Sequence, residues 1–363
     1  MLLARSPAVP PDAVQTTRST LTIERVDDTS TGAWNSFVER AANASAYHRY
    51  EWRRVITDVF GHETCYFAAR DSHGEIHGVL PTVRLRSRLF GDFFVSMPYF
   101  NYGGVLADRD DAADALIEAA AGRAKELGVG HLELRHRENV KPAWPVRTDK
   151  VAMYLRLPGN PDALGKQLGS KLRSQIKRPQ KEGAVGTNGG RELLDEFYAV
   201  FSRNMRDLGT PVYPQRWFAA ILDAFPERTR VFVVRHGGKP VAAAMLVGDR
   251  KHLEIPWASS LRESNSIGVN MLLYWNVLEY ACAQGYEVFD FGRSTVDSGT
   301  FKFKSQWGAQ PQQLYWHYWI KGGGEPPVIN PSNPKYRLAV AAWQRLPLAV
   351  ANRLGPLLVR NLP

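Results

Sequence analysis

The sequence VFDFGRS, at residues 288–294, decides the fold of this chain, because it is an apolar strand that carries an acid and ends at a glycine. The sequence FKFKSQWG follows at residues 301–308 and sets two lysines among aromatic side chains. A strand end with Asp290 and Arg293, followed closely by Lys304, suits an anionic or carbonyl-bearing ligand. A structural alternative is open, since Asp290 and Arg293 could simply pair with each other.

The residues that precede this strand are typical of an α/β unit. Residues 270–284 form a long apolar run closed by Gly285, which predicts a helix. Before it come a hairpin pattern at residues 231–248 and a strand pattern at residues 251–257. Apolar residues at helical spacing predict another helix at residues 192–208.

The first half of the chain repeats this order of elements. A hairpin is predicted at residues 64–85, an amphipathic helix at residues 110–127 and a strand at residues 131–135. The repeat predicts an α/β (α+β) fold with two tandem domains, each a mixed sheet flanked by helices. We expect the domains to span residues 21–155 and residues 156–322.

Both ends of the chain lie outside this repeat. Residues 1–20 are rich in proline, serine, threonine and alanine and are expected to be a disordered lead. Residues 323–363 are expected to be a basic amphipathic tail, whose short helical runs are broken by Pro347 and Pro356. From Pro326 onward the tail has five basic residues and no acid. It could lie on the inner face of an anionic membrane or pack across the domain interface.

Composition limits the classes of partner and cofactor. The chain has 363 residues and a formal net charge of +10, which favours nucleic acid, a phosphate-bearing ligand or an acidic membrane surface. Its two cysteines, Cys65 and Cys282, are far apart, and its histidines have no HxxxH or HExxH spacing, so we expect neither a disulfide framework nor a metal. Without a secretory signal or an apolar run of 18 residues, the chain is expected to be cytoplasmic.

A basic segment, KQLGSKLRSQIKRPQK at residues 166–181, has no acid to oppose its charge. Arg173, Lys177 and Arg178 are therefore candidates to contact the phosphates of a coenzyme A donor, since guanidinium forks bind such groups. Attraction to anionic lipid and a solvated helix face are the alternatives. Pro179 is expected to break or kink the helix.

The order of the elements is also similar to that of the GNAT N-acetyltransferases, with a helix after the central strand. The chain lacks a clear RxxGxG acyl-CoA loop, and SNSIG at residues 264–268 stands in its place. Ser266, Gly268 and Asn270 could present backbone N–H groups to a phosphate at the start of the helix. A plain cap, by Ser266 or Asn265, explains the same residues.

Several short motifs, in their order along the chain, resemble the FemAB-like acyltransferases, and most of all the FemAB family proteins associated with PEP-CTERM/exosortase and exopolysaccharide loci. The resemblance covers roughly residues 25–360. It is carried by YxWRxVI at 50–56, FGH at 60–62, GVLP at 78–81, SRLFG at 87–91, PYFNYGG at 98–104, SKLR at 170–173, IKR at 176–178, NMRxLGTP at 204–211, DFGRS at 290–294 and FKxxWG at 303–308.

This resemblance implies two GNAT-like domains, the second similar to the FemAB/BioF-like acetyltransferases, that share a cleft. It implies transfer of an acyl or aminoacyl group to an amine or hydroxyl of a cell-envelope or exopolysaccharide precursor. Acyl-CoA is the expected donor, and no metal is needed. Aminoacyl-tRNA, the donor of the peptidoglycan-bridge relatives, is the alternative, although this chain lacks their long coiled-coil arm.

The resemblance carries the lysine of the FKxxWG motif onto Lys304, as a stabiliser of the oxyanion that forms on the donor carbonyl. Lys302 is a competing candidate, because the two lysines would share a face if the segment were extended. The general base that deprotonates the acceptor would be Asp290, at the strand end, or Glu254, on the central strand of the second domain. A surface glutamate, or an aspartate that only orients Arg293, is the alternative.

Tyr99, Asn101 and Tyr102 precede a Gly-Gly turn and are expected to line the acceptor pocket, because sugars and peptides stack on aromatic faces and bond to amides. The remaining substrate contacts are assigned to Arg293, Trp257 and Trp307. Ordinary core tyrosines are the alternative. Two other classes of protein fit the charge: a non-catalytic scaffold for polysaccharide export at the membrane, and a nucleic-acid binder, although no RNA-reading motif is present.

Overall fold

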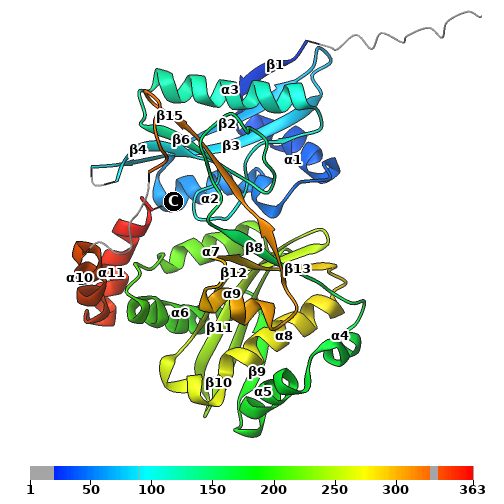
Figure 1. Ribbon diagram of the computed structural model, residues 1–363, viewed down its shortest axis with the longest axis vertical. Helices are drawn as coiled ribbons and strands as arrows, with labels where there is room; N and C mark the ends of the chain where they lie inside the picture. The colour runs from blue at the N-terminus through cyan, green and yellow to red at the C-terminus, as the bar shows by residue number, and fades with distance from the viewer. Residues whose placement is uncertain (1–19, 89, 328–333, 363) are drawn as a thin grey trace, which may run out of the picture.

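The protein is described by a computed structural model that covers residues 20–88, 90–327 and 334–362, without the side chains of residues 334–336. The expected disordered lead lies, but for residue 20, outside the described residues. Two mixed sheets with helices on their faces form two units, the first above the second in Figure 1. The predicted fold class is therefore confirmed.

The first unit is built on a sheet in the order β1-β2-β3-β4-β6-β15-β7, with β5 paired to β3. Its strands are β1 (Thr22–Arg25), β2 (Glu63–Arg70), β3 (Ile76–Ser87), β4 (Gly91–Val95), β5 (Leu106–Ala107), β6 (His131–His136), β7 (Val146–Arg147) and β15 (Tyr315–Ile320). Its helices are η1 (Asp28–Ser30), α1 (Thr31–Arg40), η2 (Ala46–His48), α2 (Glu51–Phe60) and α3 (Asp110–Glu126).

The second unit is built on a sheet in the order β14-β8-β13-β12-β11-β10-β9. Its strands are β8 (Val151–Arg156), β9 (Val185–Gly189), β10 (Thr229–His236), β11 (Lys239–Asp249), β12 (His252–Ser260), β13 (Val288–Ser294) and β14 (Gln310–Gln313). Its helices are α4 (Pro161–Gln167), α5 (Ser170–Lys181), η3 (Arg191–Leu193), α6 (Leu194–Leu208), α7 (Gln215–Ala224), η4 (Arg262–Ile267), α8 (Val269–Ala283) and α9 (Gly299–Ser305).

The first unit takes its last strand from beyond the second unit. β8 precedes the second unit's helices and lies between β13 and β14, whereas β15, which follows them, pairs with β6 of the first sheet. The boundary expected between residues 155 and 156 therefore falls inside β8. The chain crosses between the units twice, and the first sheet is complete only with β15, which returns from the end of the second unit.

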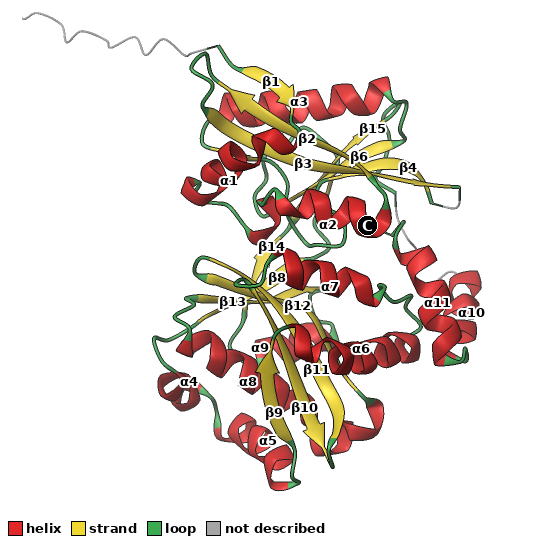
Figure 2. Ribbon diagram, turned by 180° about the vertical axis from the view of Figure 1, so that it is seen from behind, coloured by secondary structure: helices red, strands yellow, loops and turns green. Residues whose placement is uncertain are grey.

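The helices divide the molecule into layers (Figure 2). One core packs α3 on the outer face of the first sheet, and another packs α4, α5 and α8 on the outer face of the second. The core between the sheets is shared by both units and rich in aromatic rings. There Trp52 of α2 lies 4.7 Å from Phe225, and Phe60 lies 5.0 Å from Trp217 of α7, measured between ring centroids.

The structure decides two local points in the second unit that the sequence left open. α5 is not broken at Pro179, because this proline stands in the last turn and leaves only the carbonyl four residues before it without an N–H partner. The segment with Lys302 and Lys304 is not extended but forms the short helix α9, which begins where the Ser298 side chain accepts a hydrogen bond from the N–H of Phe301.

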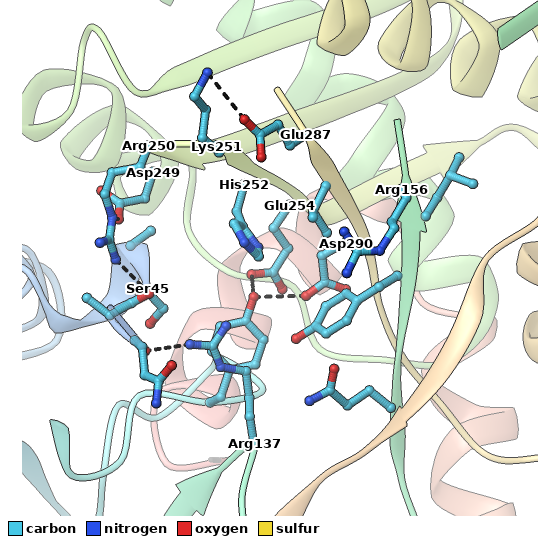
Figure 3. Close-up of a pocket in the computed structure, with 18 of the residues that line it drawn as sticks. Ser45, Arg137, Arg156, Asp249, Arg250, Lys251, His252, Glu254, Glu287 and Asp290 are labelled. Carbon is cyan, nitrogen blue, oxygen red and sulfur yellow. Dashed lines mark hydrogen bonds and ion pairs between the residues drawn. The ribbon is translucent and has the colours of Figure 1, made fainter. Parts of the chain in front are cut away.

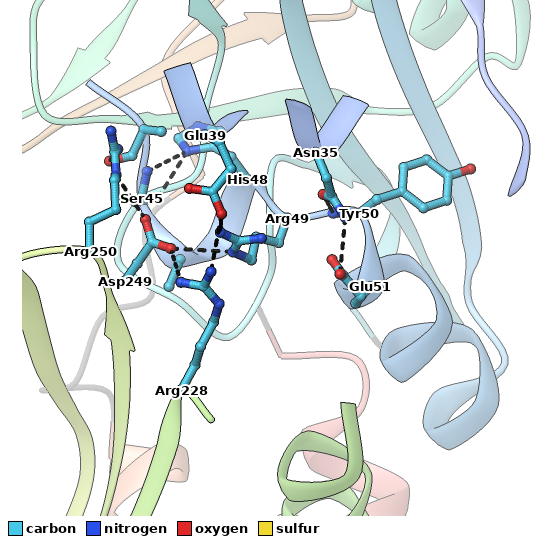
Figure 4. A network of polar contacts seen from close by, with 12 residues as sticks. Asn35, Glu39, Ser45, His48, Arg49, Tyr50, Glu51, Arg228, Asp249 and Arg250 are labelled. Carbon is cyan, nitrogen blue, oxygen red and sulfur yellow. Dashed lines mark hydrogen bonds and ion pairs between the residues drawn. The ribbon is translucent and has the colours of Figure 1, made fainter. Parts of the chain in front are cut away.

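A buried charge network also joins the units (Figure 4). Asp249, at the end of β11, accepts hydrogen bonds from Arg49 of the first unit (3.2 Å) and from Arg228 (2.7 Å). Glu39 of α1 in turn accepts from Arg49 and from Arg228. The Arg250 guanidinium donates to the carbonyls of Ala41 and Ala44. These bonds hold the β11–β12 turn against the first unit.

The tail forms two helices, α10 (Pro334–Gln344) and α11 (Leu348–Val359), that pack on α6. Pro347 separates the helices as expected, but Pro356 lies inside α11. Beyond α11, the Arg360 carbonyl accepts from the Tyr99 hydroxyl (2.7 Å), and its guanidinium donates to the Phe60 carbonyl (2.7 Å). The tail thus packs on both units. In the described part of the chain, no helix is both long and apolar enough to cross a membrane.

Candidate active site

A cavity of about 790 Å³ lies between the two units (Figure 3). The first unit contributes residues 42–46, Tyr102 and Arg137, and the second contributes parts of β8, β12, β13 and β14. Glu254 and Asp290 both line it. The two sequence candidates for the general base therefore meet in one cavity.

The backbone of β12 and β13 places these two carboxyl groups side by side. The strands are parallel and pair only from His252 with Val288 to Glu254 with Asp290, after which they diverge. β12 bends away at a shift in its register with β11, next to Pro256, which has no N–H to donate to a ladder. β13 shifts its register with β8 between Asp290 and Arg293. The carboxyl pair therefore stands at the point where the strands separate.

Side-chain alternation explains why both acids face the cavity. Successive residues of a strand point to opposite faces of the sheet. Leu253, Ile255 and Phe289 pack with α8 in the outer core of the second unit. Glu254 and Asp290 therefore point the other way, toward the first unit.

The first unit supplies the side chains that hold Glu254. Tyr47 donates to Glu254 Oε2 (2.5 Å), and Asn101 Nδ2 donates to Glu254 Oε1 (3.2 Å). The Tyr102 hydroxyl lies 3.0 Å from Glu254 Oε2 and 2.8 Å from Asp290 Oδ2, so it bridges the two acids. Asp290 Oδ1 accepts the N–H of Gly292 (2.7 Å), which lies in β13 with φ +75°.

These contacts fix the number of protons in the pair. Three oxygen–oxygen contacts join Tyr47, Tyr102 and the two acids, but two hydroxyl groups supply only two protons. A carboxyl group must supply the third. A proton on Glu254 Oε2 satisfies every contact, since it donates to Tyr102 and leaves Asp290 an anion that accepts from Tyr102 and from Gly292.

The electrostatics agree with this assignment. Burial, with the charge of Asp290 as the next cause, raises the pKa of Glu254 to about 8. Burial also raises the pKa of Asp290, but only to about 6, because Tyr102, the Gly292 N–H and Lys304 oppose the rise. Burial therefore favours a shared proton on the pair, and Asp290, whose carboxylate is stabilised by Tyr102, the Gly292 N–H and Lys304, is the candidate base.

Lys304 lies next to this pair but does not line the cavity. Its ammonium group donates to the carbonyls of Gly292 (3.0 Å) and Arg293 (2.8 Å), and burial lowers the pKa of Lys304 to about 8. It therefore holds the irregular backbone of β13 just after Asp290. Lys302 is exposed on the same helix.

The other predicted substrate residues divide into two groups. Asn101 and Tyr102 contact the acids, as described. Tyr99 lies instead among Phe60, Tyr213 and Trp217, with its hydroxyl on the Arg360 carbonyl.

Trp257 is buried against Phe100 and Phe218, and Trp307 is buried beside Tyr274 in the outer core of the second unit. Neither tryptophan lines the cavity. Arg293 is exposed with its guanidinium over Trp316, and no ion pair joins it to Asp290 among the described residues.

The predicted donor-binding residues lie in two neighbouring places on the second unit. Arg173, Lys177 and Arg178 line a basic surface hollow of about 470 Å³ on α5, which shares no residue with the cavity. The Arg173 guanidinium is partly occupied, since it donates to the Leu168 carbonyl. Figure 1 shows α5 at the end of the second unit that is remote from the first.

The start of α8 lies against α5, where Gly268 approaches the Gln175 carbonyl. Gly268 has φ +81°, and no side chain caps α8. The alternative of a cap by Ser266 or Asn265 is therefore wrong, and the Asn265 oxygen accepts from the Ser260 hydroxyl instead. Ser266 is exposed and Asn270 half-buried in the first turn of α8. The Met271 N–H bonds to the Gly268 carbonyl (2.9 Å), and no side chain accepts from the N–H groups of Val269 and Asn270, which can therefore receive an anion.

The corresponding place in the first unit is closed. β4 and β6 are parallel and pair as β12 and β13 do, but the loop after β4 fills the gap between them. Ser96 N bonds to Glu133 O (2.9 Å), Arg135 N to Ser96 Oγ (2.8 Å) and Gly103 N to Arg135 O (3.2 Å). The first turn of α3 also carries two acids, whereas that of α8 carries none. The first unit therefore offers Asn101 and Tyr102 from this loop instead of an anion site.

Two residues around the carboxyl pair, one that holds Glu254 and one that lines the cavity, had no signal in the sequence. Tyr47 lies in η2, 207 positions before its partner Glu254, and nothing in its neighbourhood marks it. Arg137 follows β6, with its guanidinium 5.1 Å from the centre of the Tyr102 ring. Their roles depend on how the units are placed, which no local pattern encodes.

Comparison with known proteins agrees with this architecture. Residues 167–305 match the model of the acetyltransferase (GNAT) domain family. Sequence comparison with curated proteins gives no significant match. The crystal structure of FemX is similar with a TM-score of 0.65 and 14% identity, over 88% of this chain and all of that one.

Two other solved structures are similar in fold. The C-terminal domain of a putative lysylphosphatidylglycerol synthetase from Agrobacterium fabrum has a TM-score of 0.54 at 15% identity, over 79% of this chain and 92% of that one. A tandem GNAT protein from the clavulanic acid biosynthesis pathway has a TM-score of 0.53 at 13% identity, over 85% of this chain and all of that one. The resemblance to FemAB-like proteins is thus confirmed at the level of the fold.

Proposed function

We propose that the protein is an acyltransferase that moves an acyl group from acyl-CoA to an amine or hydroxyl of an acceptor bound in the cavity between the units. The observation that carries the proposal is the carboxyl pair, which lies on the cavity wall where β12 and β13 diverge. The GNAT match over residues 167–305 covers these strands and α8. A buried base beside an opening between two strands is an arrangement suited to acyl transfer.

The donor binds at the second unit in this proposal. Beyond Glu254, the edge of β12 no longer pairs with β13, so the amides of a pantetheine arm could bond to it as a strand would. The open N–H groups of α8 would receive the donor phosphates, and the basic hollow on α5 adds positive charge beside them. The similar tandem GNAT protein, whose structure was solved without AcCoA, has the same overall architecture.

The residues of the cavity then take the following roles. Asp290 accepts the proton that the acceptor nitrogen or oxygen loses as that atom attacks the thioester carbonyl. The carbon–sulfur bond breaks, and the coenzyme A thiolate leaves and is protonated from solvent. Glu254 and Tyr102 hold Asp290 in its ionised form. Lys304, through its positive charge and its hold on the β13 backbone, supports the oxyanion.

The acceptor is proposed to be a cell-envelope or polysaccharide precursor. A cavity of about 790 Å³ has room for a sugar or peptide unit, and its walls carry both charges, including Arg137, Arg156, Glu138 and Glu287. An aminoacyl-tRNA is the second candidate for the donor. The observation that favours it is the basic hollow, which lies open on the outer surface of α5.

The test measures release of the coenzyme A thiol from a panel of acyl-CoA thioesters, with amino sugars, sugar alcohols and amino acids as acceptors. The proposal predicts acceptor-dependent thiol release by the parent protein and by Val185→Gln, an exposed change remote from the cavity. It predicts none from Asp290→Asn. Transfer from aminoacyl-tRNA, with no thiol release from any acyl-CoA, would show that aminoacyl-tRNA and not acyl-CoA is the donor. The absence of both reactions in a folded protein would overturn the proposal.

A further inference from the structure

The tail helices carry apolar side chains that no part of the described chain covers. On α11, Val350, Leu354 and Leu357 are 39%, 41% and 62% exposed, and their spacing of four and three residues puts them on one face. The opposite face, with Ala351 and Val359, is buried. On α10, Leu338 is 72% exposed. The stripe on α11 and the exposed leucine on α10 are features of surfaces that meet a partner.

The same surface is positively charged. Arg353 lies within the stripe of α11, and Arg345 is exposed at the end of α10. No aspartate or glutamate occurs from Pro326 to the end of the sequence, so nothing in the tail neutralises these charges. We name the exposed residues Leu338, Arg345, Val350, Arg353, Leu354 and Leu357 the outer tail face.

We infer that the outer tail face docks on a membrane surface of anionic phospholipid. Leucines between arginines suit the boundary of a bilayer, where hydrocarbon receives the apolar groups and lipid phosphates receive the guanidinium groups. A nucleic acid would leave the leucines in water. A second copy of this face would bring arginines against arginines, because a twofold interface pairs a surface with itself.

The tail is fixed to the body, so docking would orient the whole molecule. α10 and α11 pack on α6, and the residue after α11, Arg360, is bonded to Tyr99 and Phe60 of the first unit. Gly355 of α11 comes so close to the backbone of Val212 that an added Cβ would lie 2.8 Å from its nitrogen. The tail is thus a rigid platform. This inference does not depend on the proposed transferase activity.

Flotation of the full-length protein with vesicles tests the inference. We expect binding to vesicles that contain phosphatidylglycerol and none to vesicles of phosphatidylcholine alone. Leu354→Gln with Leu357→Gln should weaken binding about tenfold or more, since each exposed leucine loses its hydrocarbon contact. Arg353→Glu with Arg345→Glu should weaken it by a factor of about five for each arginine lost, or more, and should reduce the weakening of binding by added salt, because fewer charge contacts remain to be screened.

Matched controls separate this face from the rest of the surface. Val185→Gln removes an apolar side chain that is 66% exposed on β9, and Lys177→Glu with Arg178→Glu reverses charge in the α5 hollow. Both should bind vesicles like the parent, and unfolding curves should show that every variant is folded.

Three results would overturn the inference. In the first, the leucine variant floats like the parent, or the parent does not float. In the second, the arginine variant loses binding to a labelled tRNA while its vesicle binding is unchanged. In the third, light scattering shows that the leucine variant turns a dimer into a monomer without a change in vesicle binding.

Discussion

At the scale of single residues, Tyr102 links two carboxyl groups that would otherwise repel each other. Its hydroxyl can donate only one proton, so the acid on its other side must be protonated. Asp290 is proposed as the base, because the Gly292 N–H and the nearby Lys304 favour its carboxylate. The sequence placed both acids on neighbouring strands and left the choice of base open. The contacts that join the two acids come from Tyr47 and Tyr102, in distant parts of the chain.

Substitution of the two acids should have unequal effects. Asp290→Asn removes the proton acceptor and should lower kcat by about a hundredfold or more, within the range for general bases. Glu254→Gln should retain activity within about tenfold, because its amide N–H can donate to Tyr102 as the protonated acid does. Steady-state kinetics of the two variants with one donor and acceptor pair provide the check. The reverse order would make Glu254 the base.

Tyr102→Phe should shift the pH–rate profile. The base works when it is deprotonated, so the rate of the parent should rise with pH through the Asp290 pKa of about 6. The Tyr102 hydrogen bond lowers the pKa of Asp290, and its loss should move the rising limb to higher pH. Tyr99→Phe is the matched control, because its hydroxyl bonds to the Arg360 carbonyl and not to the acids. If the rising limb of the pH–rate profile of Tyr102→Phe stayed at the parent's pH, the Tyr102 hydroxyl would not control the pKa of Asp290.

Lys304→Met should destabilise the protein as well as inactivate it. The change leaves the carbonyls of Gly292 and Arg293 without their donor, which should cost about 2 kcal/mol of the free energy of unfolding. Lys302→Met, on the exposed side of α9, should be neutral in both respects. Urea unfolding and kinetics measure the two effects. If Lys304→Met were as stable as the parent, Lys304 would not be needed to hold the β13 backbone. If it were as active as the parent, Lys304 would have no part in catalysis.

At the scale of elements, periodicity predicted the long helices and the hairpins because each buries one face or one stripe within its own segment. α3, α6 and α8 all lie where apolar spacing placed them. α9 was missed because seven residues are too few for a helical period to show, and alternating Lys and Phe also fit an extended strand. The sequence left two readings of the start of α8, an anion site and a plain cap, because Asn265 and Ser266 are good caps by type, and only the structure shows that neither caps the helix.

Charge reversal on α5 should weaken the binding of acyl-CoA. Lys177→Glu with Arg178→Glu places negative charge beside the start of α8, and we expect an affinity loss of about tenfold or more at low salt. Lys125→Glu, an exposed change at the end of α3, should leave the affinity unchanged. Isothermal titration with acetyl-CoA measures both. Equal affinity of the α5 variant and the parent for acetyl-CoA would show that the hollow does not contribute to donor binding.

At the scale of the whole molecule, the site exists only where the two units meet. The side chains that bond to Glu254 all come from the first unit, and the acids come from the second. The repeat of elements in the sequence predicted two similar units. It could not show that β15 returns to the first sheet. Nor could it show that the second unit keeps an open gap between its parallel strands while the first unit does not. Both features depend on pairings between residues far apart in sequence.

The charge network between the units should be required for stability. Arg49→Met removes one of the positive charges that pair with the buried Asp249 carboxylate. It should therefore lower the free energy of unfolding by about 3 kcal/mol. Arg54→Met is the matched control, since the Arg54 side chain is 88% exposed and its ion pair with Asp58 contributes little. Chemical unfolding followed by tryptophan fluorescence compares the two. Equal stability of both variants would show that the shared aromatic core alone holds the units together.

The most direct test of the central claim is a crystal structure of the protein with a non-hydrolysable acyl-CoA analogue. We predict that the phosphates lie at the start of α8 and that the pantetheine arm follows the free edge of β12. The acyl carbonyl should then lie beside Asp290, in the cavity between the units. An analogue bound beside α3 in the first unit, or confined to the α5 hollow with no acyl group near Asp290, would contradict the account.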